Sequence, residues 1–207
     1  MSDDTLSAEQ ITEAGLADWR PMLNALHARF ATTDFATGLQ LVEQIGAAAE
    51  AANHHPEIAL SYGFVVVHLS SHDSGGITDR DVALARQISD AASGLGVAAD
   101  PAKVTVAELC LDSPDYAKVL PFWAAVMGYE ENGDEVKDGS GLLPTIWFQE
   151  SGSDDPRQRF HIDVHVDPAQ RQARIDAAVA AGGTVVDEAA TFTVLADQEG
   201  NRVCICV

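Results

Sequence analysis

Histidines whose spacing could serve proton transfer are concentrated in the first part of the chain. His54 and His55 are adjacent and precede Pro56, while His72 follows a valine-rich segment. An imidazole has a pKa of ~6.5 and can give or take a proton at neutral pH, so one histidine could protonate a leaving oxygen while another removes a proton elsewhere. Glu50 lies four residues before His54 and could orient one of the imidazoles. These residue types predict acid/base chemistry.

Two other interpretations of the same histidines stay open when residue types alone are considered. Glu50 could be a solvated helix residue, and the histidines could be incidental. A metal site is the third interpretation, and it is weaker because no cysteine and few spare carboxylates accompany the histidines.

A helix followed by a rigid break is predicted to carry the first two histidines. Apolar residues recur at steps of three and four over residues 34–52, which predicts an amphipathic helix whose buried face includes Phe35 and Leu39. Pro56 disfavours helix at His55 and fixes its own φ. We therefore expect the two imidazoles to lie on a rigid, irregular segment.

A strand, a turn and a second helix are predicted around the third histidine. Residues 62–71 are rich in valine and aromatic side chains and predict a strand. The glycines at 75–76 indicate a turn. Thr78 and Asp81 fit a capping box that opens a helix through about residue 92.

The flanks of this region are less regular. Residues 6–30 favour a helix with a Ser7 cap, interrupted at Pro21, and residues 25–30 have the alternation of a first strand. Residues 97–103 have the composition of a linker.

The run Glu50-x3-His54-His55-Pro56-x5-Tyr62-x9-His72-x8-Asp81 resembles, at every position, the signature of the pterin-4a-carbinolamine dehydratase family. The resemblance covers about residues 5–95. It implies a four-stranded antiparallel sheet with helices packed on one face. It also implies a hydro-lyase that dehydrates 4a-hydroxytetrahydropterin to quinonoid dihydropterin, as part of pterin recycling, with no metal and no cofactor.

The same resemblance implies a role for each residue of the signature. His54, His55 and His72 would surround the 4a-hydroxyl group and supply acid and base. The backbone of the turn after the strand, together with the His-His-Pro turn, would hold the pterin ring. Asp81 would either orient a histidine or only cap its helix. The residues expected to bind or support the substrate are Glu50, Pro56, Tyr62, Ser71, Asp73, Ser74 and Asp81.

The second half of the chain has a different order of predicted secondary-structure elements, and this order occurs twice. Each copy is predicted to contain a strand, a helix and then two or three short strands, as in a βαβββ unit. The expected elements are a strand at 104–111, a helix at 114–127 and strands within 129–150, then a strand at 160–166, a helix at 168–181 and strands near 184–187, 191–196 and 202–207.

Short motifs in this half resemble a glyoxalase-like domain of the vicinal-oxygen-chelate superfamily. They are Leu109 to Asp115, Phe122-Trp123 with Gly128-Tyr129, Arg159 to Val164, and Asp197-x2-Gly200-Asn201-Arg202. The resemblance implies two βαβββ modules forming a cupped sheet around a pocket whose ligand is unknown.

The metal-dependent members of that superfamily place ligands at positions matched here by Glu108, His161 and Cys204. Glu108 and His161 could ligate a metal, but a cysteine in place of a carboxylate fits an oxygen-rich site poorly. We therefore expect a metal-free pocket or a structural module, with no metal site.

The sequence thus predicts an α+β protein with a dehydratase-like domain at 1–100 and a glyoxalase-like domain at 101–207. The leading function is dehydration of the pterin by the histidines. A non-catalytic protein that binds a pterin or another small ligand is an alternative. Metal-dependent lyase, isomerase or dioxygenase chemistry in the second domain is another.

Composition and charge limit the partners. Lys and Arg total 12 against 32 Asp and Glu, a net charge of −20. A field this negative repels phosphate backbones and anionic bilayers, so we expect neither nucleic acid nor membrane as a partner. The family resemblance suggests a homo-oligomer.

The cysteines and the N-terminus bear on the compartment. Cys110, Cys204 and Cys206 are odd in number, and the last two are close together in a strand-like segment. We expect reduced thiols and a cytoplasmic protein, since the acidic start of the chain lacks the features of a secretory signal.

Overall fold

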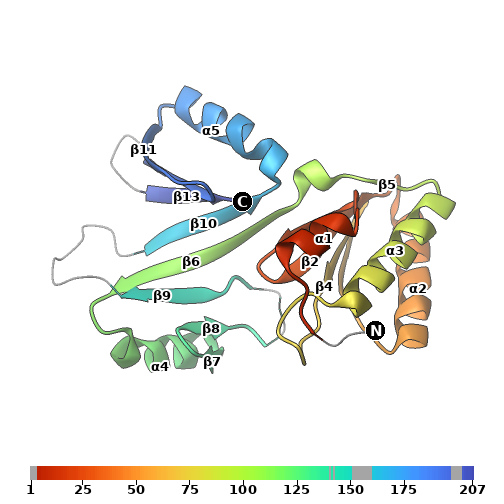
Figure 1. The fold of residues 1–207 in the computed structure, drawn as a ribbon, viewed down its shortest axis with the longest axis horizontal. Helices are drawn as coiled ribbons and strands as arrows, with labels where there is room; N and C mark the ends of the chain where they lie inside the picture. Colours follow the sequence, from red (N-terminus) through yellow and green to blue (C-terminus); the bar gives the residue numbers. More distant parts are fainter. Residues whose placement is uncertain (1–3, 140, 142, 151–159, 197–201) are drawn as a thin grey trace. The chain divides into compact units, whose positions relative to one another are not determined.

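The computed structural model describes residues 4–139, 141, 143–150, 160–196 and 202–207. The chain divides into two compact units, Met1–Val104 and Thr105–Val207, and each has its own sheet (Figure 1). The predicted α+β class is confirmed. Within the described ranges, no helix is both long enough and apolar enough to cross a bilayer.

The sheet of the first unit is antiparallel throughout. Its four main strands have the order β1-β2-β4-β3, and β5 pairs with β2 beyond the end of β1. The resemblance implied four strands, so β5 is an addition. The strands are β1 Trp19–Met22, β2 Ala25–Ala31, β3 Glu57–Ser61, β4 Phe64–Leu69 and β5 Ala98–Ala99.

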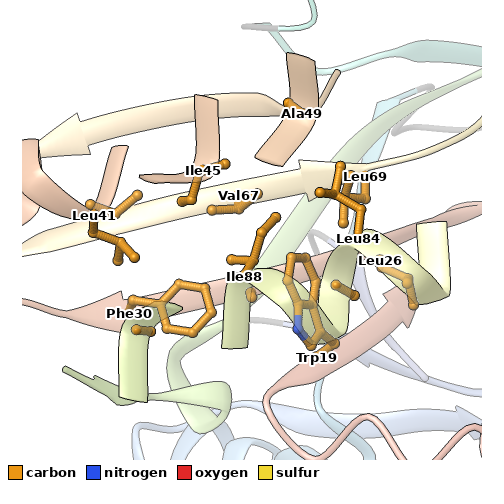
Figure 2. Packing of buried hydrophobic residues seen from close by; sticks show 14 of the residues in the cluster. Trp19, Leu26, Phe30, Leu41, Ile45, Ala49, Val67, Leu69, Leu84 and Ile88 are labelled. Carbon is orange, nitrogen blue, oxygen red and sulfur yellow. The ribbon is translucent and has the colours of Figure 1, made fainter. Parts of the chain in front are cut away.

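Helices cover one face of this sheet. They are α1 (Ala8–Glu13), α2 (Phe35–Ala52) and α3 (Asp79–Gly94), and α2 packs beside α3. Buried apolar side chains pack between the sheet and the helices (Figure 2). The core includes Trp19, Leu26, Phe30, Leu41, Ile45, Ala49, Val67, Leu69, Leu84 and Ile88.

The predicted helix over residues 6–30 is only partly right. Ser7 caps a helix as expected, but α1 ends at Glu13, and residues 19–22 form β1. Leu23 and Asn24 both have positive φ, 49° and 60°, and make the tight turn that pairs β1 with β2. This hairpin turn has the backbone that suits antiparallel strands.

The predicted buried face of α2 is wrong at its first turns. Phe35 and Leu39 are exposed, and the buried positions are Gly38, Leu41, Ile45 and Ala49. Gly38 lies where α2 packs closely against β3, and a Cβ at this position would lie only 2.6 Å from Leu60 Cδ1. A small residue therefore marks the buried face where a large one was expected.

The predicted strand over residues 62–71 and the linker at 97–103 also need correction. Tyr62 lies in the hairpin turn between β3 and β4, and β3 was missed. The supposed linker belongs to the first unit, because it contains β5 and the short helix η1 (Pro101–Lys103). Arg29 Nη1 also forms an ion pair with Asp100 Oδ2 at 2.9 Å.

The second unit has the two predicted βαβββ modules, which are confirmed. The first contains β6 (Thr105–Ser113), α4 (Tyr116–Met127), β7 (Glu130–Asn132), β8 (Glu135–Lys137) and β9 (Ile146–Glu150). The second contains β10 (Phe160–Val166), η2 (Pro168–Gln170), α5 (Arg171–Ala180), β11 (Thr184–Glu188), β12 (Phe192–Ala196) and β13 (Arg202–Cys206).

These strands form one sheet of order β11-β12-β13-β10-β6-β9-β8-β7. The modules meet where β6 pairs antiparallel with β10, and each of these strands also pairs in parallel with the last strand of its own module. Alternate side chains therefore share a face. One face is apolar and packs on α4 and α5, while the other carries Cys110, Asp112, His161, Asp163 and Cys204.

Candidate active site

The end of α2 turns His54 toward the interior of the first unit. Asn53 follows the helix in the left-handed conformation, with φ 47° and ψ 43°, and this reverses the chain. His54 is buried, and its Nε2 lies 2.7 Å from Oδ1 of Asp81. Because an ionised carboxylate only accepts hydrogen bonds, Nε2 carries the hydrogen and Nδ1 is left to exchange a proton.

Asp81 performs two tasks with its two oxygens. Oδ1 accepts from His54, while Oδ2 accepts from Thr78 N at 2.8 Å and from Ser71 Oγ at 2.7 Å. The carboxylate is fully buried. The sequence left open whether Asp81 orients a histidine or caps α3, and the geometry shows both contacts at once. The result is an imidazole fixed by a satisfied buried carboxylate.

His55 faces outward and pairs with a different carboxylate. Its Nε2 lies 3.1 Å from Glu50 Oε1, and both side chains are more than half exposed. Glu50 was expected to orient one of the imidazoles, and the structure pairs it with His55. The adjacent histidines therefore differ, since one is enclosed and the other is open to solvent.

The turn after β4 holds His72 at the surface. The Ser71 N–H donates to Gly76 O at 2.9 Å, and the Ser71 carbonyl accepts from Ser74 N and Gly75 N. The main-chain N–H and carbonyl groups of Ser71 therefore both form hydrogen bonds within the turn. His72 and Asp73 are exposed, and Ser74 is half-buried.

Arg80 is a residue that the sequence reasoning missed. Its Nη2 lies 2.6 Å from Asp73 Oδ1 and 3.4 Å from Ser74 Oγ, so it ties the first turn of α3 to the turn that carries His72. The hydrogen bond from Arg80 holds the pKa of Asp73 below its usual value. A signal was present, because a cation in the first turn of a helix opposes the helix dipole and implies a specific acidic partner.

A cavity of about 220 Å³ lies beside His54, between the end of α2 and the start of α3. Its walls are Ala51, Ala52, His54, Arg80, Ala83, Leu84 and Gln87. The small alanine side chains leave this space open. The candidate residues thus fall into three local groups: His54 with Asp81 and Ser71, His55 with Glu50, and Arg80 with Asp73 and Ser74.

The candidate Tyr62 lies elsewhere, and so does His68. Tyr62, at 78% exposure, is in the hairpin turn at the far end of β3 from Glu57, so it does not join these groups. His68 alternates with the core residues of β4 and faces away from the helices. It stacks on His27 with ring centroids 4.5 Å apart.

In the second unit, strand register separates the two metal candidates named from the sequence. Glu108 is opposite Asp163, and its Oε2 lies 3.8 Å from His165 Nε2. His161 is opposite Cys110, and its Nδ1 lies 3.9 Å from Cys204 Sγ. Most of the motif at 197–202, together with Arg159, lies outside the described residues.

All three cysteines are free thiols. Burial raises the pKa of Cys204 to about 12 and that of Cys206 to about 11. The thiols are therefore protonated at neutral pH and are weak nucleophiles.

Comparison with known families gives a match to each half of the chain. Residues 4–91 match the family model described as pterin 4 alpha carbinolamine dehydratase, and residues 108–206 match the one described as a glyoxalase-like domain.

Curated relatives match the first unit along nearly their whole length. A protein of Metallosphaera sedula is 34% identical over 87 residues, which are 41% of this chain and 91% of the relative. One of Nocardia farcinica is 38% identical over 94 residues, which are 44% of this chain and 99% of the relative. Both carry the name "Putative pterin-4-alpha-carbinolamine dehydratase".

Solved structures give partial matches. A transcriptional coactivator/pterin dehydratase from Brucella melitensis is 30% identical, with 43% of this chain and 99% of that chain covered and a TM-score of 0.42. A glyoxalase/bleomycin resistance protein/dioxygenase superfamily member from Vibrio splendidus is 15% identical, with 50% and 100% covered and a TM-score of 0.34.

Proposed function

The chain belongs, through its first unit, to the pterin-4a-carbinolamine dehydratase family, and from this premise we propose that it dehydrates 4a-hydroxytetrahydropterin to quinonoid dihydropterin. In this reaction the bond from C4a to the hydroxyl oxygen breaks. The oxygen leaves as water after it gains a proton, and a ring nitrogen of the pterin loses a proton. The reaction therefore needs an acid and a base, and it needs no change of oxidation state.

The observation that carries the proposal is the buried pair of His54 and Asp81. An imidazole that donates from Nε2 to a carboxylate can accept a proton at Nδ1, and the carboxylate stabilises the imidazolium that forms. The Nε2–Oδ1 distance is 2.7 Å, and His54 also lines the cavity. We assign His54 the role of base.

The exposed histidines supply the acid in this proposal. His55 Nε2 lies 3.1 Å from Glu50 Oε1, and this contact orients the exposed imidazole. His72 is carried by the turn that Arg80 and Asp73 hold together. Either imidazole can deliver a proton to a hydroxyl group that enters from solvent, and both recover their protons from water.

The remaining residues have supporting roles in this proposal. Ser71 orients Asp81 through a hydrogen bond. The His-His-Pro turn and the turn after β4 hold the pterin ring between them. No step is assigned to the second unit, which we treat as an accessory domain with a ligand of its own.

Stopped-flow turnover of 4a-hydroxytetrahydropterin by the full-length protein tests the proposal. The His54→Ala variant should be slower by roughly 10²–10⁴, the usual contribution of a positioned acid or base. His165→Ala, a half-buried histidine of the second unit, is the matched control and should turn over like the wild type. A wild-type chain that binds a pterin tightly without turnover would show the alternative, a binding protein.

A further inference from the structure

The second unit contains a group of metal-ligating side chains that the proposed pterin chemistry does not use. The thiol of Cys110, the carboxylate of Asp112 and the imidazole of His161 each offer one donor atom, and these atoms lie within 4.8 Å of one another. The group forms on the polar face of the sheet, away from α4 and α5. Because a sulfur, an oxygen and a nitrogen converge, the question is which cation they suit.

Strand pairing is the reason that the three side chains meet. Cys110 on β6 is the direct partner of His161 on β10, and Asp112 lies two residues further along the same face of β6. The His161 Nε2 atom is 4.0 Å from Asp112 Oδ1. The donors therefore stand on two neighbouring strands in the middle of the sheet, which is a rigid support for a site.

The orientation of the imidazole is fixed from its other side. His161 Nδ1 lies 3.1 Å from Asp163 Oδ1, and Asp163 Oδ2 accepts a hydrogen bond from Trp147 Nε1 at 3.1 Å. Since a carboxylate only accepts, Nδ1 carries the hydrogen, and Nε2, which lies 4.0 Å from Asp112 Oδ1, keeps a lone pair that can bind a metal. Metal-ligating histidines usually have this arrangement, with a carboxylate on the nitrogen that does not bind the metal.

We propose that Cys110 Sγ, Asp112 Oδ and His161 Nε2 bind one divalent transition-metal ion, with Zn²⁺ as the preferred metal. A thiolate excludes Mg²⁺ and Ca²⁺, which take oxygen ligands, whereas zinc accepts sulfur, nitrogen and oxygen together. Tetrahedral ligands at ~2.0–2.3 Å from zinc are ~3.3–3.8 Å apart. The donors need to close by only about 1 Å, which side-chain rotation can supply.

Three protein ligands leave a fourth position for water or a ligand, as in catalytic zinc sites. Binding releases the thiol proton of Cys110, and it releases a second proton if His161 is an imidazolium beforehand. This donor set differs from the positions suggested by the family resemblance, because Glu108 faces His165 instead.

A neighbouring set is the rival site. His161, Asp163 and Cys204 also bring three donor atoms within 4.8 Å, but they use the Nδ1 side of the imidazole. Asp163 already occupies Nδ1 at 3.1 Å, and Cys204 Sγ is 3.9 Å from it. The geometry favours the Nε2 set, and the two sets can be separated by their cysteines.

Metal titration of the full-length, chelator-treated protein tests the site. Co²⁺ is the spectroscopic probe, because a thiolate ligand gives it a charge-transfer band and a tetrahedral site gives it intense visible absorption. Zn²⁺ should then displace Co²⁺ with one ion per chain. Cys110→Ser should lose the charge-transfer band, whereas Cys204→Ser and Cys206→Ser should keep it.

Two further variants keep the result interpretable if Cys110→Ser folds poorly. Asp112→Asn, at a partly exposed side chain, should weaken Zn²⁺ binding without a change in the far-ultraviolet circular dichroism of the metal-free protein. Asp163→Asn should weaken Zn²⁺ binding by roughly 10- to 100-fold, because it removes the carboxylate that orients His161. Loss of the band in Cys204→Ser with retention in Cys110→Ser would overturn the assignment, and so would a wild-type protein that binds no stoichiometric Co²⁺ or Zn²⁺.

Discussion

The two units assemble reactive side chains in opposite ways. In the first, His54 and Asp81 come from the end of one helix and the start of another, and they meet in a buried pair. In the second, Asp112 and His161 come from paired strands, and their side chains are 24% and 19% exposed. The helix ends of the first unit thus bury two interacting side chains, while the sheet of the second unit places several side chains next to one another on a partly exposed face.

This difference has a consequence for stability. Asp81 is at once a helix cap and the partner of His54, so the chemistry of the first unit is built into its fold. The polar face of the second unit lies opposite its apolar cores, so its partly exposed groups Asp112 and His161 can be replaced with little effect on folding. Substitutions at equivalent groups should therefore behave differently in the two units.

The largest expected effect is on turnover in the first unit. His72→Ala should slow the dehydration by roughly 10²–10⁴ with little loss of stability, because His72 is exposed at a strand end. His68→Ala, on the outer face of the same sheet, is the control and should keep wild-type turnover. Unchanged turnover in His72→Ala would remove this residue from the mechanism.

The next effect is on the free energy of unfolding. Asp81→Ala should cost ~2–4 kcal/mol, because it removes a cap and leaves buried donors of Thr78, Ser71 and His54 unsatisfied. Asp112→Ala, a partly exposed carboxylate of the second unit, should cost less than ~0.5 kcal/mol. Urea unfolding of each variant measures both values, and equal losses would contradict the contrast between the units.

A smaller effect concerns pH in the second unit. The hydrogen bond to Asp163 raises the pKa of His161, so the folded state favours its protonated form. The stability that the folded state gains from protonated His161 is fully present below pH ~6.5, the ordinary histidine pKa, and is lost as the pH rises through the raised pKa. Melting temperatures of chelator-treated protein should therefore fall on the alkaline side, and His161→Gln should remove this fall.

The control for this pH dependence is His165. Burial lowers its pKa, so the folded state favours the neutral form and stability is lost as pH falls. His165→Gln should therefore change the acid limb of the stability profile and leave the alkaline limb. A change in the same limb for both variants would contradict the assignment.

The smallest effect compares two glycines in α2. A Cβ at Gly46 meets no atom within 4 Å, so Gly46→Ala should stabilise the first unit by ~0.5–1 kcal/mol. At Gly38 the same change places a Cβ 2.6 Å from Leu60 Cδ1, and the gain should be absent or reversed. Thermal unfolding of the two variants decides whether Gly38 marks the close contact between α2 and β3.

Much of the first unit could be predicted because its signals are local. The capping box of Thr78 and Asp81 and the helix break before Pro56 both involve neighbours in sequence. The burial of His54 and the exposure of His55 could not be predicted, since the left-handed Asn53 decides which imidazole turns inward. Arg80 was missed because its partner Asp73 is on another element.

In the second unit the elements could be predicted and the donor set could not. Period and turn residues indicated both βαβββ modules, but the partner of each residue across β6 and β10 depends on register. A shift in register changes every pair. The pairing of His161 with Cys110, and not with Glu108, is therefore information that only the structure supplies.

The central claim is that the first unit holds the dehydration chemistry by itself, and turnover by separated fragments tests it most directly. Residues 1–104 should fold, because β5 and the Arg29–Asp100 ion pair are then retained, and should convert 4a-hydroxytetrahydropterin at close to the full-length rate. Residues 105–207 should fold and show no turnover. A folded but inactive 1–104 fragment, beside an active full-length chain, would contradict the account and assign part of the site to the second unit.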